Sequence, residues 1–244
     1  GKFYYAVDAT NPASPILKWK RGKTSTDFGE LGLTFSTPIR SVLQWDSNDP
    51  KPVIMFGGGY DDRKDSESPL SLTAASADDT EGNAIFIVDA LDGDLVWKAV
   101  NGTDAPTDYV YSTTSLHDSI PSDLTVASVN AGRDSDGNNI ADRIYVGDTG
   151  GTVFRADLVG TDREQWSITP VLKAGRHAST SPADRRFFHA PAVFRSEDST
   201  GAYVGFAIGT GNRAHPKQSH LVDRLFMVKD RVATGNVTFG LIET

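Results

Sequence analysis

A nine-residue stretch, residues 134–142, concentrates the side chains of this chain that are best suited to chemistry. Oxygen-bearing side chains occupy its first, third, fifth and ninth positions, and a glycine stands fourth, where a sharp turn would need it. Calcium takes about six to eight hard oxygen ligands at roughly 2.3–2.6 Å in a flexible shell. We therefore expect a Ca²⁺ site whose ligands are Asp134, Asp136, Asn138, the backbone carbonyl of Ile140, and Asp142.

The loop differs from an EF-hand. Its twelfth position is Tyr145, where an EF-hand needs a bidentate glutamate, and strand-like runs rather than helices flank it. Three carboxylates about 4–5 Å apart repel one another by roughly 1 kcal/mol per pair even in water, so the loop should loosen without a cation. Magnesium fits less well because it requires a compact octahedron and retains its waters. The alternative is an Asp- and Asn-rich hairpin turn that binds no metal.

The other motifs in the sequence do not point to catalysis. The Gly57-Gly58-Gly59-Tyr60 run could indicate a phosphate cradle, but no Lys-Ser/Thr pair and no helix pattern follow it, which favours a turn at the end of a strand. His117-Asp118 lies near several serines, yet the Gly-x-Ser-x-Gly elbow of a hydrolase is absent. We therefore expect a non-enzymatic protein with no catalytic and no organic cofactor-binding residues.

Short apolar runs rich in Val, Ile and Phe must position the acidic loop. Gly, Pro, Asn and Asp bound each run, which is typical of β-strands. No stretch of a dozen residues keeps the i, i+3, i+4, i+7 spacing of an amphipathic helix. The pattern predicts an all-β fold with strands that include residues 3–7, 52–56, 84–88, 143–146 and 202–208.

A weak internal repeat organises these strands. One half is a strand that ends in aspartate, a turn, and a short strand with tryptophan, at residues 6–19, 88–97 and, more loosely, 155–166. The other half is an apolar strand, a polar loop, and a strand that ends in glycine, at residues 38–57, 124–147 and 191–209. Four-stranded units that recur about every 40–60 residues are typical of β-propeller blades. We expect several four-stranded antiparallel blades, roughly three and part of a fourth, as a fragment of a larger propeller.

Two polar segments rich in Asp, Ser and Thr, residues 61–82 and 101–121, interrupt the repeat without a strand pattern. We expect both to be long loop insertions on one rim, where loops can carry binding function. Residues 1–244 would then form part of one β-propeller domain, with the calcium loop at 134–142. The chain is either cytoplasmic or an internal piece of a longer protein, and the repeat pattern at both ends favours the second.

Composition excludes several classes of protein. Lys and Arg total 24 against 32 Asp and Glu, a net charge of −8 at pH 7, which argues against nucleic acid or anionic lipid as the main partner. No apolar run is long enough to span a bilayer as a helix, and the absence of cysteine excludes disulfides and zinc–thiolate sites. The 12 Phe, seven Tyr and four Trp supply material for a folded core.

Several motifs follow one another along the chain. They are a strand-Asp-x-x-Asn-Pro segment, a Leu-Gly entry ending in Ser-x-Pro, a Phe-Gly-Gly-Gly-Tyr turn, the acidic loop, a Tyr-x-Gly-Asp run ending in Arg-x-Asp-Leu, and a Gly-Thr-Gly turn, at residues 3–12, 31–38, 56–60, 134–142, 145–158 and 209–213. Their order resembles the C-terminal β-propeller of the PilY family of type IV pilus biogenesis and tip-associated proteins. Two departures, Phe154 for the usual Trp and Thr152 for the usual Asn, affect packing more than metal binding.

This resemblance implies a calcium-binding protein that acts in calcium-dependent pilus extension and retraction, twitching motility and surface adhesion. It implies export through the periplasm to the outer membrane, the cell surface or the pilus tip. The implied partners are the type IV pilus machinery or minor pilins, and a host or abiotic surface. Two alternatives remain, an integrin-like calcium-stabilised adhesion or scaffold propeller and a quinone-dependent dehydrogenase. The first usually repeats its calcium loop in several blades, and the second needs tryptophan docking motifs on most blades.

Overall fold

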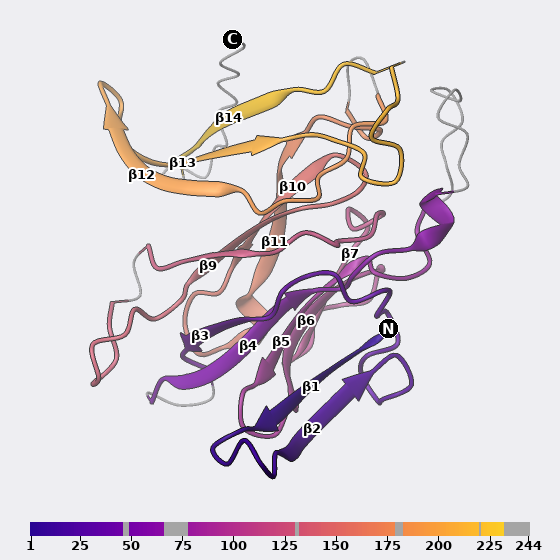
Figure 1. The fold of residues 1–244 in the computed structure, drawn as a ribbon. Helices are drawn as coiled ribbons and strands as arrows, with labels where there is room; N and C mark the ends of the chain where they lie inside the picture. Colours follow the sequence, from indigo (N-terminus) through magenta and orange to yellow (C-terminus); the bar gives the residue numbers. More distant parts are fainter. Residues whose placement is uncertain (46–48, 66–77, 130–131, 179–182, 220, 232–244) are drawn as a thin grey trace.

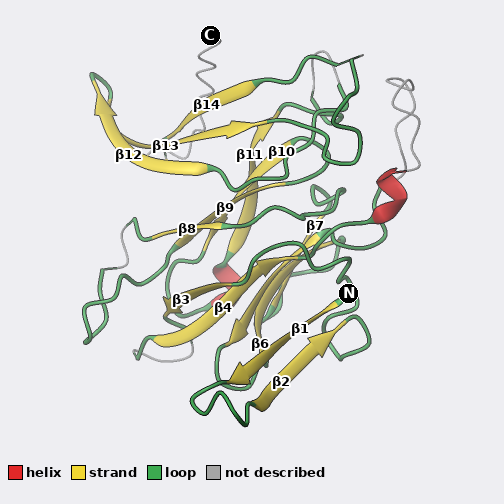
Figure 2. Cartoon of the chain, in the orientation of Figure 1, coloured by secondary structure: helices red, strands yellow, loops and turns green. Residues whose placement is uncertain are grey.

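The computed structural model describes residues 1–45, 49–65, 78–129, 132–178, 183–219 and 221–231, and strands dominate this part of the chain (Figures 1 and 2). Two 3₁₀-helices, η1 (Asp62–Asp65) and η2 (Arg163–Gln165), are the helices within it. The all-β prediction is confirmed. In the described residues, neither helix has the length and apolar character needed to cross a bilayer.

The strands form four sheets that follow one another in chain order. The first sheet pairs β1 (Phe3–Asp8) with β2 (Ile16–Gly22), and the second has the order β3 (Ile39–Leu43), β4 (Lys51–Gly57), β5 (Ala84–Asp89), β6 (Leu95–Asn101) and β7 (Val110–Thr113). The third contains β8 (Thr125–Ala127), β9 (Arg143–Gly147), β10 (Thr152–Asp157) and β11 (Ser167–Lys173). The fourth contains β12 (Ala192–Asp198), β13 (Gly201–Gly209) and β14 (Leu225–Asp230).

The internal repeat corresponds to antiparallel hairpins. The strand–Asp–turn–strand half forms the pairs β1–β2, β5–β6 and β10–β11, and the half that ends in glycine forms β3–β4, β8–β9 and β12–β13. Asp8 and Asp89 each accept a hydrogen bond from the backbone N–H two residues later, at 2.9 and 2.8 Å. This Asx-turn geometry explains why aspartate ends these strands. One half of each kind makes a four-stranded antiparallel unit in the second and third sheets.

Neighbouring sheets share hydrophobic cores, one for each pair of sheets. In β5, Ile85 and Ile87 face the core shared with the third sheet, whereas Phe86 and Val88 face the core shared with the first. A further core joins the third and fourth sheets. Because β5 is covered on both faces, its apolar run is continuous rather than alternating. None of the four sheets closes on itself within the described residues.

The segment at residues 101–121 differs from the prediction. It contains β7, which pairs with β6 in parallel from Lys98↔Val110 to Asn101↔Thr113. The expectation of no strand there was wrong, because a run of only four residues, half-buried at each position, carries too little alternation to read. Of the segment at residues 61–82, positions 66–77 lie outside the described residues, and η1 and residues 78–82 pack on the sheets.

Glycines at the end of β4 let four segments of backbone meet. Gly58 N donates to Ala84 O, and Gly58 O accepts from Gly32 N, at 2.7 and 2.9 Å. Gly59, with φ of 100°, donates its N–H to Ile120 O at 3.0 Å. The predicted turn at Gly57-Gly58-Gly59-Tyr60 is wrong: the run continues from β4 into isolated bridges of Gly59 with Ile120 and of Tyr60 with Leu33. The missing side chains of the glycines permit this close approach.

Substitution of Gly58 tests this junction. A Cβ at Gly58 would lie 2.4 Å from Gly82 O and 2.9 Å from Ala84 N, both backbone atoms that cannot move aside alone. We expect Gly58→Ala to lower the free energy of unfolding by about 2 kcal/mol or more, measured by urea denaturation. The matched control is Gly29→Ala, whose Cβ would meet no atom within 4 Å and should change stability little. Equal losses in both variants would contradict the junction's role.

Candidate functional site

Two polar sites lie at opposite ends of strand β9. The acidic loop, residues 134–142, leads into β9 at Arg143, and a turn at residues 148–151 follows the strand at Gly147. In Figure 1 the acidic loop lies on the side of the sheets away from η1. The predicted calcium ligands and η1 therefore lie at different ends of the described part of the molecule.

The acidic loop is folded around the carboxylate of Asp134. Asp134 Oδ1 accepts from the backbone N–H groups of Asp136 and Asn138, at 3.0 and 2.7 Å, and Oδ2 accepts from Asn138 Nδ2 at 2.8 Å. These bonds, the one from the Asn138 side chain first, lower the pKa of Asp134. Gly137 has a φ of 82°, the left-handed conformation that the sharp turn requires.

Ile140 and Asp142 attach the loop to the sheets. The Ile140 side chain is buried, as predicted, and Ala141 N donates to Val42 O at 2.8 Å. Asp142 is 2% exposed, and its Oδ1 accepts from Val129 N at 2.8 Å. Asp142 therefore links the C-terminal end of the loop to the segment that follows β8.

The structure brings Asp134 and Asn138 together, whereas Asp136 is exposed and its carboxylate has no hydrogen-bond or ion-pair partner among the described residues. Asp134, Asp136 and Asp142 do not place one oxygen each within 4.8 Å of one another. In the described part of the chain a different acidic group does so, namely Asp61, Asp62 and Glu81. Its carboxylates are engaged by cations, since Arg63 binds Asp61, and Lys2 and Lys23 bind Glu81.

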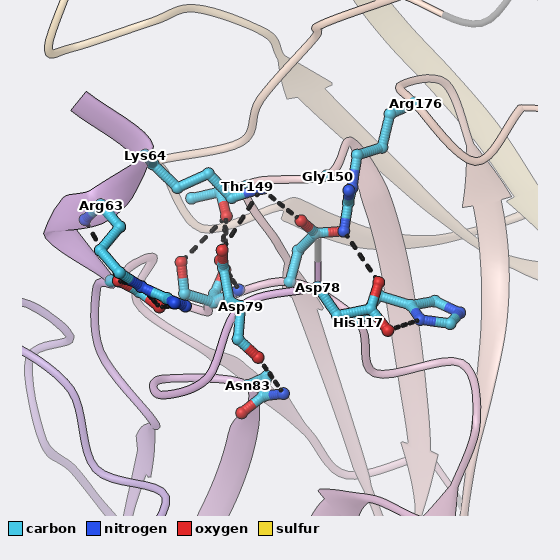
Figure 3. Close-up of polar contacts among 12 residues, drawn as sticks. Arg63, Lys64, Asp78, Asp79, Asn83, His117, Thr149, Gly150 and Arg176 are labelled. Atoms are coloured by element: carbon cyan, nitrogen blue, oxygen red, sulfur yellow. Dashed lines mark hydrogen bonds and ion pairs between the residues drawn. The ribbon is translucent and has the colours of Figure 1, made fainter. Parts of the chain in front are cut away.

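The second site is a buried ionic network that the sequence analysis missed (Figure 3). Lys64 Nζ donates to Asp118 Oδ1 at 2.7 Å and lies 3.4 Å from Asp79 Oδ1. All three side chains are at most 3% exposed. Asp79 Oδ2 also accepts from Ser119 N at 2.7 Å. The two carboxylates therefore hold η1, at the start of the first insertion, to the C-terminal ends of both insertions.

Arginine and histidine extend the network to the surface. Asp118 Oδ2 accepts from Arg176 Nε at 2.8 Å and lies 2.9 Å from His177 Nε2. Asp78 contacts Arg176 Nη2 at 3.2 Å and His117 Nδ1 at 2.9 Å. The two histidine rings stack with their centroids 4.5 Å apart. The loop after β11 is therefore joined to both insertions.

Burial and charge act in opposite directions on the two carboxylates that bind Lys64. Burial alone would raise the pKa of Asp118, but the hydrogen bond with His177 and the charges of Lys64 and Arg176 hold it well below its usual value. At Asp79 burial prevails over the attraction of Lys64 and raises the pKa. The network therefore fixes Asp118 as a carboxylate.

A third carboxyl, Asp148, lies in the turn after β9 and is fully buried. Its Oδ1 accepts from Gly150 N and Thr152 N, at 3.0 and 2.7 Å, whereas Oδ2 has no partner among the described residues. Burial, and then the charge of Asp118, raise the pKa of Asp148 well above its usual value. Burial of Asp148 beside Asp118 therefore favours its neutral form, which adds less negative charge to the network than a carboxylate would.

The network joins segments that are far apart in the sequence, and its hydroxyl and imidazole groups are engaged in contacts of their own. Among the contacts of the described residues, the Ser119 hydroxyl pairs with Thr149 Oγ1 at 2.9 Å, and His117 pairs with Asp78. A nucleophile needs its base within hydrogen-bond reach, and these contacts do not supply that. One signal could have revealed the network: residues 61–82 hold seven acidic residues but only two basic ones, of which Lys64 is one.

Two substitutions distinguish the roles of the buried carboxyls. We expect Asp118→Asn to destabilise the protein by about 3 kcal/mol at pH 7, because Lys64 and Arg176 each lose the buried carboxylate that they contact most closely. Asp148→Asn keeps the acceptor for Gly150 and Thr152 and removes a buried acid, so it should leave stability at pH 7 unchanged or higher. Urea denaturation measures both.

The pH dependence gives an independent readout. A raised folded-state pKa means that the Asp148 contribution is full below its unfolded pKa, near about 4, and is lost as pH rises through the folded value. The depressed pKa of Asp118 has the opposite effect, since its contribution is lost as pH falls. Asp148→Asn should therefore flatten the decline of stability above pH 4. A steeper decline in that variant would contradict the protonated state.

Comparison with known proteins gives matches to curated sequences. No protein-family model matches the chain. The type IV pilus biogenesis factor PilY1 homolog of Xylella fastidiosa (strain Temecula1) is 24% identical over 235 residues, which cover 96% of this chain and 15% of that protein. Type IV pilus biogenesis factor PilY1 of Pseudomonas aeruginosa (strain UCBPP-PA14) is 28% identical over 166 residues, 67% of this chain and 11% of that protein.

A solved structure shares the fold. The crystal structure of the Pseudomonas aeruginosa PilY1 C-terminal domain aligns with a TM-score of 0.63 and 22% identity, over 97% of this chain and 45% of that chain. The present chain therefore spans less than half of the solved domain and less than a sixth of either curated relative. With sequence and fold in agreement, this chain is homologous to the PilY1 proteins and has the fold of the PilY1 C-terminal domain.

Proposed function

We propose that this chain is a calcium-binding, non-enzymatic β-propeller segment of a type IV pilus-associated protein. The observation that carries the proposal is that a chain homologous to PilY1 over 235 residues contains an acidic loop with oxygen ligands at alternate positions. Both named relatives are type IV pilus biogenesis factors. The expected role is calcium-dependent pilus extension and retraction, with twitching motility and surface adhesion as its outcomes.

The sheet arrangement supports the propeller assignment. Four-stranded antiparallel units follow one another in the chain, and successive sheets share cores face to face. The blades of a β-propeller follow one another in this order around a ring. This chain covers 45% of the solved domain, so the remaining blades would come from a longer chain. The propeller is therefore proposed for the longer protein, to which these sheets would contribute about three blades.

The donor set of the loop suits a hard cation. Asp134, Asp136 and Asp142 supply carboxylates, Asn138 an amide oxygen and Ile140 a backbone carbonyl, the ligand types that calcium takes. Within the described residues the Asp136 carboxylate has no hydrogen bond or ion pair to give up. Asn138 Nδ2 bonds Asp134, which leaves Oδ1 of the amide as its acceptor. A bound calcium would supply positive charge that offsets the repulsion of the three carboxylates. Asp142 connects that charge to Val129 and β8.

The proposed partners follow from the relatives' names. The type IV pilus machinery or minor pilins would contact the propeller at the outer membrane, cell surface or pilus tip, and host or abiotic surfaces would be the adhesion targets. A calcium ion can influence such a partner only if the loaded and empty loops differ in their affinity for it. The link from Asp142 to the segment after β8 is the connection through which the loop's state can alter the neighbouring surface.

Asp136→Asn is the sharpest test of calcium binding. The Asp136 carboxylate makes no contact with the described residues, so its loss should leave the metal-free stability unchanged, while calcium affinity falls by about tenfold or more. Asp142→Ala should abolish binding and keep the β-sheet circular dichroism. The control is Asp92→Asn, an equal charge change at an exposed turn. Unchanged calcium affinity in both loop variants, measured by calorimetry, would overturn the metal assignment.

The cellular role is tested in the bacterium that carries the protein. We expect the Asp136→Asn variant, expressed at wild-type level, to reduce surface pili and twitching distance, because a loop without calcium would not present the form that favours extension. The Asp92→Asn variant should behave as wild type. Normal piliation in a variant that has lost calcium binding would show that the pilus function does not require the bound metal.

A further inference from the structure

Asp27 adopts a backbone conformation that its residue type does not favour. Its φ of 70° is the one positive value for a residue other than glycine in the described part of the chain. Phe28 N donates to Ser25 O at 3.2 Å and closes a four-residue turn in which Asp27 is third. Turns with positive φ at this position normally take glycine or asparagine there. Glycine would adopt this conformation with less strain than aspartate does.

The fold holds this turn without using the Asp27 carboxylate. Lys98 Nζ donates to the backbone O of Asp27 at 2.9 Å, and the buried Phe28 ring stacks on Phe86 at 5.3 Å between centroids. The carboxylate itself has no hydrogen bond or ion pair with any described residue. No such contact of the Asp27 side chain with the described residues thus offsets the backbone conformation, which is the circumstance in which an unusual conformation suggests a functional contact.

The turn forms one wall of an open cavity of about 450 Å³. Asp27, Thr26 and Ser25 line it on one side, and Asp94 and Tyr109 line it from the start of β6 and the segment before β7. Tyr109 is 46% exposed, and the side chain of Asp94 is 74% exposed. Both are available to a ligand.

The wall also carries a fixed cation. Arg21 donates from Nε to Gly93 O at 2.9 Å and from Nη2 to Asp94 Oδ1 at 2.6 Å. The guanidinium is therefore held in place beside the carboxylate. The lining combines carboxylates and a guanidinium with the hydroxyl groups of Ser25 and Thr26 and an exposed aromatic ring.

We propose that this cavity binds a neutral pyranose sugar. Each sugar hydroxyl both donates and accepts, so it can pair with a carboxylate and with a fixed donor at once. Asp27 would accept from adjacent hydroxyls, and the Tyr109 ring would cover the apolar C–H face of the sugar. Arg21 and Asp94 neutralise each other, and Asp27 adds one negative charge, which disfavours an anionic ligand. The volume accommodates one or two sugar rings.

This inference does not depend on calcium, because the cavity shares no residue with the acidic loop. The test uses the full protein and four probes: methyl α-glucoside, methyl α-mannoside, methyl β-galactoside and N-acetylglucosamine. Saturation-transfer NMR and titration measure binding. We expect saturable binding of at least one probe, and Asp27→Gly should weaken it by about tenfold or more. The melting temperature of that variant should be unchanged or higher, since glycine relieves the strain.

Two further variants complete the experiment. Tyr109→Leu should weaken the same sugar without loss of fold, and Asp104→Gly, a matched change at an exposed loop residue outside the cavity, should bind as wild type does. Full affinity in Asp27→Gly would overturn the proposal, as would saturable binding of Nα-acetyl-lysine amide with none of any sugar. A fall in melting temperature of Asp27→Gly would assign the residue to the fold and would also overturn it.

Discussion

The neutralisation of Lys64 is the interaction on which the insertions depend. An ammonium group that is 2% exposed is tolerated only with counter-charges in contact, and Asp79 and Asp118 supply them. These two aspartates lie 39 residues apart in the sequence, one near the end of each insertion (118 − 79 = 39). One cation therefore fixes two long connections that the sheets alone would leave loosely attached. Arg176 then joins the loop after β11 to the same carboxylate.

This placement divides the molecule into two ends with different physical properties. At one end of β9 the charges are buried and balanced within the protein, so the surface there is held in one form. At the other end Asp136 and Asn138 are exposed, and the hydrogen bonds that shape the turn around Asp134 come from within the loop itself. The two ends are joined by β9, which is buried at all of its positions, but they differ in exposure.

The sequence allowed prediction of features that are encoded locally. Strand-ending aspartates such as Asp89 bond their own turns, and the nine residues of the acidic loop contain a complete donor set, so both are legible in short windows. The network was missed because Lys64 meets Asp118 across 54 positions, and no periodicity records such a pair. The strand β7 was missed because its pairing partner, β6, and not its own pattern, defines it.

Carboxylate density alone is a poor guide to a metal site, as two acidic groups of this protein show. Asp61, Asp62 and Glu81 bring their oxygens within 4.8 Å of one another, yet Arg63, Lys2 and Lys23 already provide positive charge there. In the acidic loop the nearby arginine, Arg133, donates to the carbonyl of Gly137 rather than to a carboxylate. A divalent cation gains most where carboxylates lack a protein cation, because only there does it remove repulsion instead of displacing an ion pair. For the calcium site proposed above, this argument applies to Asp134 and Asp136, because neither carboxylate has an ion pair among the described residues.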